Sequence, residues 1–90
     1  METTVTLKEG PFKIDELKPG ELQKHPEQGY YLACPKCGIP MSIRTWDVKI
    51  DSNGITIRPS IANPKMVNGQ PNGHQCDFHI FVTNSKIEYL

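Results

Sequence analysis

The sequence predicts a mostly β domain of antiparallel hairpins, with one short helical turn at most. Two observations carry this prediction. Asn53-Gly54 stands between two segments of alternating apolar and polar residues, which is a strong hairpin signal. Asn84-Ser85 separates a second pair of alternating segments near the end of the chain. No heptad or internal repeat competes with this reading.

The first third of the chain contains two expected strands. Residues 3–10 alternate and end at Gly10-Pro11, which predicts a short strand. A single helical turn is expected over Asp15–Lys18, and Pro19-Gly20 is expected to end it. Residues 23–29 are polar and predict a loop, and residues 30–33 predict the second strand.

The middle of the chain predicts a hairpin. Residues 41–50 are rich in strand formers, and residues 55–61 return after the turn so that Ile55 and Ile57 face Val48 and Ile50. Pro59 is expected to end the ladder or mark an edge, since proline has no amide hydrogen to donate.

The last third predicts a loop and a final hairpin. Residues 62–75 hold two prolines and two glycines and predict a long loop. Phe78, Ile80 and Val82 alternate, so Phe81 falls out of phase and is expected to be exposed or to pack on the opposite face.

Length and composition predict one domain over residues 1–90 with a lean core. Apolar residues make up 37% of the chain and the mean hydropathy is −0.47. Small domains of this kind often need a disulfide or a metal. The polar start lacks a secretory signal and no apolar run could span a membrane, so we expect a reducing cytoplasm. There, close cysteine pairs are more often metal ligands or redox centres.

The cysteines predict one structural zinc ion. Cys34 and Cys37 form Cys-x-x-Cys, and 38 residues later Cys76 and His79 form Cys-x-x-His. Four such ligands suit tetrahedral zinc, and the layout is that of a zinc ribbon with an unusually long gap. His74 stays open as an alternative fourth ligand, because regular strand geometry would point Cys76 and His79 to opposite faces.

Other roles for these residues compete with zinc. Cys34 and Cys37 could be ordinary buried thiols or a redox pair, although redox pairs of the thioredoxin type begin a helix and a strand follows here. A three-cysteine zinc enzyme would use Asp77 as its base. No serine is expected to be a nucleophile, because none has the context of a nucleophile elbow; the serines are Ser42, Ser52, Ser60 and Ser85.

The chain also resembles a known family. The segments "IDELKPGEL", "YYLACPKCG", "ITIRPSI" and "CDFHIFVTNSKIEYL" follow the order of landmarks in a phage and mobile-element family catalogued as a domain of unknown function. Members often carry the misleading label ammonia monooxygenase. The resemblance covers about residues 12–90. Asn84-Ser85 departs from the glycine common in the family's closing turn, and residues 62–75 are longer than in its shorter members.

The resemblance implies a ligand set and a type of role. Cys34, Cys37, Cys76 and His79 would be the zinc ligands, Pro59-Ser60-Ile61 the family's "Pro-Ser-Ile", and Trp46 its core tryptophan. The family occurs in phages and beside bacterial ubiquitin-like conjugation systems, which implies a binding or adaptor role.

From these observations we expect a non-enzymatic adaptor that binds a host or partner protein. If the chain is phage-encoded, its place is the host cytoplasm. The alternative is a nucleic-acid-binding zinc ribbon, although ten basic and ten acidic residues cancel. Its contacts would be basic side chains on one face: Lys36, Arg44, Lys49 and Arg58. A small zinc enzyme is the third possibility.

Overall fold

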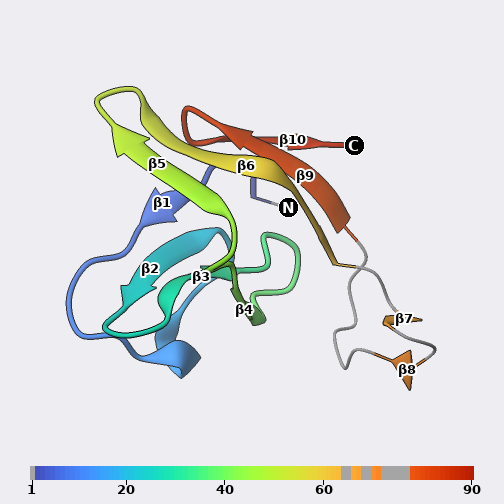
Figure 1. The fold of residues 1–90 in the computed structure, drawn as a ribbon, viewed down its shortest axis with the longest axis horizontal. Coiled ribbons are helices and arrows are strands. Elements are labelled where there is room, and N and C mark those ends of the chain that lie inside the picture. Colours follow the sequence, from blue (N-terminus) through green and yellow to red (C-terminus); the bar gives the residue numbers. More distant parts are fainter. Residues whose placement is uncertain (1, 64–65, 68–69, 72–77) are drawn as a thin grey trace.

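The computed structural model describes residues 2–63, 66–67, 70–71 and 78–90, and these confirm a mostly β fold (Figure 1). The described elements are β1 (Thr6–Leu7), η1 (Ile14–Glu16), β2 (Glu21–His25), β3 (Gly29–Ala33), β4 (Pro40–Ser42), β5 (Asp47–Asp51), β6 (Gly54–Asn63), β7 (Met66–Val67), β8 (Gln70–Pro71), β9 (Phe78–Thr83) and β10 (Lys86–Tyr89). The element η1 is a single 3₁₀ turn, in agreement with the one helical turn that the sequence predicts.

The strands form two four-stranded sheets and a small two-stranded one. The first sheet has the order β1-β2-β3-β4, and the second has the order β10-β9-β6-β5. Both expected hairpins are present in the second sheet, as β5-β6 and β9-β10. Within the first hairpin, Val48 pairs with Ile57 and Ile50 with Ile55, as the alternation predicts.

A single core lies between the two sheets, which Figure 1 shows as two layers. The buried members of this core are Val5, Leu22, Leu32, Cys34, Ile43, Ile55, Ile57, Ile61, Ile80 and Val82. On one side they come from β2, β3 and the residues directly before β1, after β3 and after β4, and on the other side they come from β6 and β9. Burial of these side chains is the main stabilising term of so small a domain.

The N-terminal segment joins the two sheets. The strand β1 pairs in parallel with β2, an exception to the antiparallel pattern. Just before it, the amide of Val5 donates to the carbonyl of Ser85 (2.8 Å), and the amide of Ile87 donates to the carbonyl of Thr3 (2.9 Å). The segment therefore ties the first sheet to the β9-β10 hairpin.

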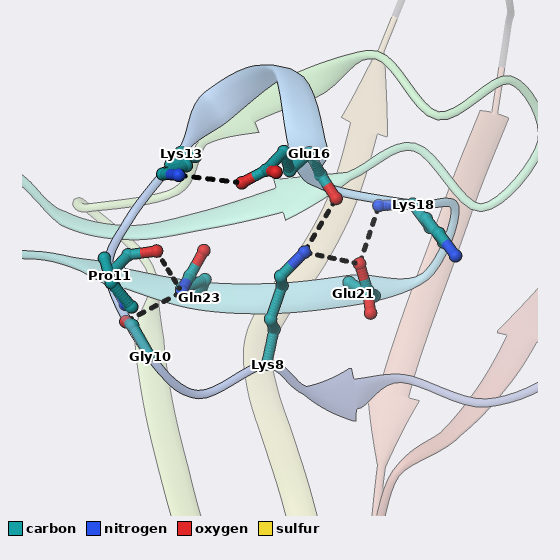
Figure 2. Close-up of polar contacts among 8 residues, drawn as sticks. All are labelled: Lys8, Gly10, Pro11, Lys13, Glu16, Lys18, Glu21 and Gln23. Carbon is teal, nitrogen blue, oxygen red and sulfur yellow. Dashed lines mark hydrogen bonds and ion pairs between the residues drawn. The ribbon is translucent and has the colours of Figure 1, made fainter.

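One expected loop is partly a strand, because a polar side chain can be buried when its amide hydrogens find acceptors, even though Oε1 of Gln23 has no hydrogen-bond partner within the described part of the chain. β2 runs to His25, into the predicted loop at residues 23–29. Gln23 is 2% exposed, and its Nε2 donates to the carbonyls of Gly10 (3.1 Å) and Pro11 (3.3 Å), as Figure 2 shows. These bonds offset much of the cost of burying the amide.

The same close-up shows how Lys8 holds the connection between β1 and β2 (Figure 2). Its Nζ donates to the carbonyl of Glu16 (2.7 Å) and lies 3.8 Å from the carboxylate of Glu21. The side chain thus links the 3₁₀ turn to the start of β2.

Three further expectations need correction. The segment 41–50 is two strands rather than one, since a turn at residues 43–46 lies between β4 and β5. Pro59 does not end the ladder, because β6 continues to Asn63 across an irregularity in its pairing with β9. The expected loop at residues 62–75 includes the end of β6 and the strands β7 and β8; its other residues lie outside the described part.

Candidate functional site

A serine and a histidine meet on the second sheet. The Oγ atom of Ser60 lies 2.7 Å from Nε2 of His79. Ser60 is half-buried and His79 is exposed, so the pair can be reached from solvent. A serine hydroxyl hydrogen-bonded to an imidazole is the arrangement that activates serine as a nucleophile.

Strand pairing explains why the two side chains meet. Ser60 and His79 each directly precede a buried isoleucine, Ile61 on β6 and Ile80 on β9, and these isoleucines pair with one another. Successive side chains of a strand point to opposite faces. Because both isoleucines face the core, Ser60 and His79 both face outward. The imidazole spans the diagonal between the strands.

The backbone at both residues is fixed by neighbouring segments. The indole Nε1 of Trp46 donates to the carbonyl of Ser60 (3.2 Å) from the turn before β5. The amide of Leu90 donates to the carbonyl of His79 (2.9 Å) from the end of β10. Trp46 itself packs against the core, so the expected core tryptophan also anchors the serine.

A depression of about 670 Å³ lies on the same sheet and is lined by neighbours of the pair rather than by Ser60 or His79 themselves. Its lining includes Phe81, two residues beyond His79 on the same face, and Arg58, two residues before Ser60. Lys86 and Glu88 of β10 form part of its other wall. Phe81 is half-buried there, which agrees with the expectation that it packs opposite the core.

Sequence reasoning set Ser60 aside and gave His79 a different role. A nucleophile elbow places its serine on a strand-to-helix turn, whereas Ser60 lies within the strand β6. The available signal was the phase of each residue, one position before a core isoleucine. That signal becomes useful only when β6 and β9 are known to be neighbours, which no short-range pattern indicates.

The two described cysteines lie in one tight turn after β3. Cys34 is buried in the core, and Cys37 is exposed. Burial raises the pKa of the Cys34 thiol, while hydrogen bonds from the backbone amides of Cys37 and Lys36 act in the opposite direction. Gly38 closes the turn with φ of 85° and donates its amide to the carbonyl of Cys34 (2.8 Å).

This turn fits half of a metal site. Two sulfurs two residues apart, with backbone amides directed at one of them, match the donor arrangement of a zinc knuckle. Of the other expected ligands, His79 lies against Ser60 on the second sheet, whereas Cys76 and the alternative His74 lie outside the described residues. Over the described ranges, no group of three or more His, Cys, Asp or Glu side chains is placed to hold a metal ion.

Two of the four basic side chains expected to contact nucleic acid interact instead with groups of the protein itself. Lys49 lies 3.9 Å from the carboxylate of Asp51. The guanidinium of Arg58 donates to the carbonyls of Ile57 and Val82. The structure therefore gives the nucleic-acid alternative no support.

Comparison with known proteins gives one match. A family model described as "Bacterial ubiquitination-like system serine protease (BubE)" matches residues 8–90. No curated protein and no solved structure matches the chain. Among the described elements, no helix has the length and apolar character needed to cross a membrane.

This match overturns the functional expectations drawn from the sequence. The family is named for a serine protease, so a non-enzymatic adaptor is wrong, and so are the alternatives of a nucleic-acid-binding ribbon and a zinc enzyme. The description names a bacterial system and gives no support to a phage or mobile-element origin. Because the match covers nearly the whole chain, the protein belongs to the family of bacterial ubiquitination-like system serine proteases.

Proposed function

We propose that this protein is a serine peptidase in which Ser60 is the nucleophile and His79 the general base. The observation that carries the proposal is the 2.7 Å contact between Ser60 Oγ and His79 Nε2 on a solvent-accessible face. The family description supports the same class of reaction. Within the described residues the pair is a Ser-His dyad, and Asp77 lies outside them.

The first half of the reaction forms an ester. With its proton on Nδ1, His79 presents Nε2 as the acceptor for the Ser60 hydroxyl. Ser60 Oγ attacks the carbonyl carbon of the scissile amide while its proton passes to Nε2. The tetrahedral intermediate collapses when the imidazolium gives that proton to the leaving nitrogen, which departs as an amine.

The second half restores the enzyme. A water molecule gives a proton to His79 Nε2 and attacks the ester carbonyl. Collapse of this second tetrahedral intermediate breaks the bond to Ser60 Oγ, which regains its proton from the imidazolium. The released product is a carboxylic acid.

We propose a protein of the ubiquitination-like system as the substrate. The family description names such a system, whose components are proteins. The depression beside Phe81 and Arg58 supports this substrate class, because it offers an apolar wall and charged groups along an extended path. The cytoplasm remains our proposed location, because buried Cys34 is a free thiol, as is usual in a reducing compartment.

We further propose that residues 1–90 form one domain stapled by zinc through Cys34, Cys37 and Cys76. When His79 is assigned to proton transfer, His74 becomes the histidine for the metal. This choice is supported by the opposite orientations of two neighbours: Ile80 belongs to the same core cluster as Cys34, whereas His79 faces the other side of the sheet. The metal would supply a structural cross-link.

A serine-directed fluorophosphonate probe tests the activity. We expect stoichiometric labelling of the purified protein, with the adduct on Ser60 by mass spectrometry. The Ser60→Ala variant should lose labelling, and cleavage of a conjugate from the native system should fall by at least about 10³-fold.

Ser42→Ala is the matched control, because Ser42 is an exposed serine of β4 on the other sheet. It should label at the wild-type rate. Undiminished labelling or cleavage by a folded Ser60→Ala variant would remove Ser60 as the nucleophile.

A further inference from the structure

The two strands that carry the proposed dyad are irregularly paired beside it. Ile57 of β6 pairs with Val82 of β9, and the next pair is Ile61 with Ile80. Residues 58–60 of β6 therefore stand opposite Phe81 alone. A bulge of this kind interrupts the hydrogen-bond ladder locally. The backbone hydrogen bonds between β6 and β9 are therefore interrupted next to Ser60.

The side chain of Arg58 bridges this gap. Its Nη1 donates to the carbonyl of Ile57 (3.0 Å) and to the carbonyl of Val82 (2.8 Å), and its Nη2 donates to Oγ1 of Thr83 (2.6 Å). Its Cζ lies 5.4 Å from the ring centroid of Phe81, as in a cation–π contact. The guanidinium thereby replaces ladder bonds with side-chain bonds from β6 to β9.

We propose that Arg58 is a positioning residue that holds Ser60 at its working distance from His79, an inference that rests on the proposed peptidase function. Ser60 follows Arg58 by two residues, and His79 is on β9, the strand to which the Arg58 side chain is hydrogen-bonded. A functional constellation tolerates displacements of only about 0.5 Å. The planar fork of arginine suits this task, because it directs its donors to several acceptors in a fixed plane, whereas the donors of a lysine ammonium have no such fixed arrangement.

The labelling rate of the fluorophosphonate probe isolates this effect. The probe is small and makes little contact with the depression, so its rate reports the reactivity of the serine. We expect Arg58→Ala to label about 10- to 100-fold more slowly than wild type. Arg58→Lys should also be slow, despite keeping the charge and stem. Guanidinium chloride at a non-denaturing concentration should restore the rate of Arg58→Ala several-fold and leave wild type unchanged.

Arg44→Ala is the control, since Arg44 is the other arginine of the chain and is exposed on the turn before β5. It should label like wild type. If Arg58→Ala is unfolded by circular dichroism, Arg58→Lys decides: slow labelling with a wild-type melting temperature supports the proposal. Wild-type labelling by any folded Arg58 variant overturns it, as does slow labelling of folded Arg58→Ala that guanidinium leaves unchanged.

The two proposals fail in different ways. If Ser60→Ala still labels, the nucleophile is elsewhere and the peptidase assignment itself is lost. If Ser60→Ala is silent while Arg58→Ala labels at the wild-type rate, the dyad stands and only the role of Arg58 is removed.

Discussion

Ser60 Oγ and His79 Nε2 are 2.7 Å apart in space, although the two residues are separated by 19 positions in the chain. The contact depends on the pairing of β6 with β9. In this pairing Ala62 lies opposite His79, and Ser60, two residues before Ala62 on the same face, is the diagonal neighbour of His79. The proposed dyad therefore depends on a tertiary register rather than on a local motif.

The first prediction concerns His79. His79→Gln keeps a polar group near Ser60 but removes the base, so kcat should fall by about 10²–10⁴-fold. The melting temperature should change little, because the side chain is exposed. Steady-state cleavage assays measure the effect.

His25→Gln is the matched histidine control. His25 lies in the first sheet, where its Nδ1 accepts hydrogen bonds from the amides of Glu27 (3.0 Å) and Gln28 (3.1 Å). Its activity should equal that of wild type. Equal losses in both variants would show that the effect is not specific to the proposed base.

Much of the fold was predictable because local rules act strongly on it. The turn residues at Asn53-Gly54 and Asn84-Ser85 fix two hairpins, and in the structure both Asn84 and Ser85 have positive φ, 50° and 66°. The extent of β2 was not predicted, because Nε2 of its buried Gln23 donates to carbonyls of a distant segment, and no local pattern reveals these bonds.

The site was less predictable for a related reason. Ser60 lies in a bulge that places residues 58–60 opposite Phe81. A proline at position 59 indicated the end of a strand, whereas the strand continues through the irregularity. The Cys-x-x-His spacing favoured a shared metal site for His79 and Cys76. The contact of His79 with Ser60 becomes visible only in the pairing of the two strands.

The second prediction concerns Trp46. Trp46→Phe retains most of the packing but removes the indole donor to the carbonyl of Ser60. We expect a loss of about 1 kcal/mol in the free energy of unfolding by urea denaturation, together with slower probe labelling of Ser60. Tyr31→Phe is the comparison, because it removes an exposed hydrogen bond to Gln28 (2.8 Å) in the other sheet. A larger loss of stability or labelling in Tyr31→Phe would contradict the anchoring role.

The third prediction contrasts two glycines with positive φ. Gly54 has φ of 118°, and a Cβ built there would lie 2.5 Å from Ser85 Oγ and 2.9 Å from the backbone carbon of Asn84. Gly10 has φ of 99°, with nothing within 4 Å of such a Cβ. Both alanine substitutions should cost about 1–3 kcal/mol of backbone strain.

Gly54→Ala should cost a further 1–3 kcal/mol or so, because the β5-β6 turn must move away from the β9-β10 turn. Urea denaturation of both variants measures the difference. Equal destabilisation would mean that the two turns separate without cost.

The last prediction concerns the proposed zinc. The purified protein should contain about one zinc ion per chain, and a chelator should lower its melting temperature, because metal affinity in such sites contributes directly to folding. Cys37→Ser should lose the ion and melt at the lower temperature, with no further change on adding chelator. His74→Ala should also lose zinc, whereas His79→Gln should retain it while losing cleavage. Zinc loss in His79→Gln would instead make His79 a metal ligand and remove it as the base for Ser60. A zinc-free wild-type protein whose melting temperature is unchanged by chelator would show that Cys34 and Cys37 bind no metal.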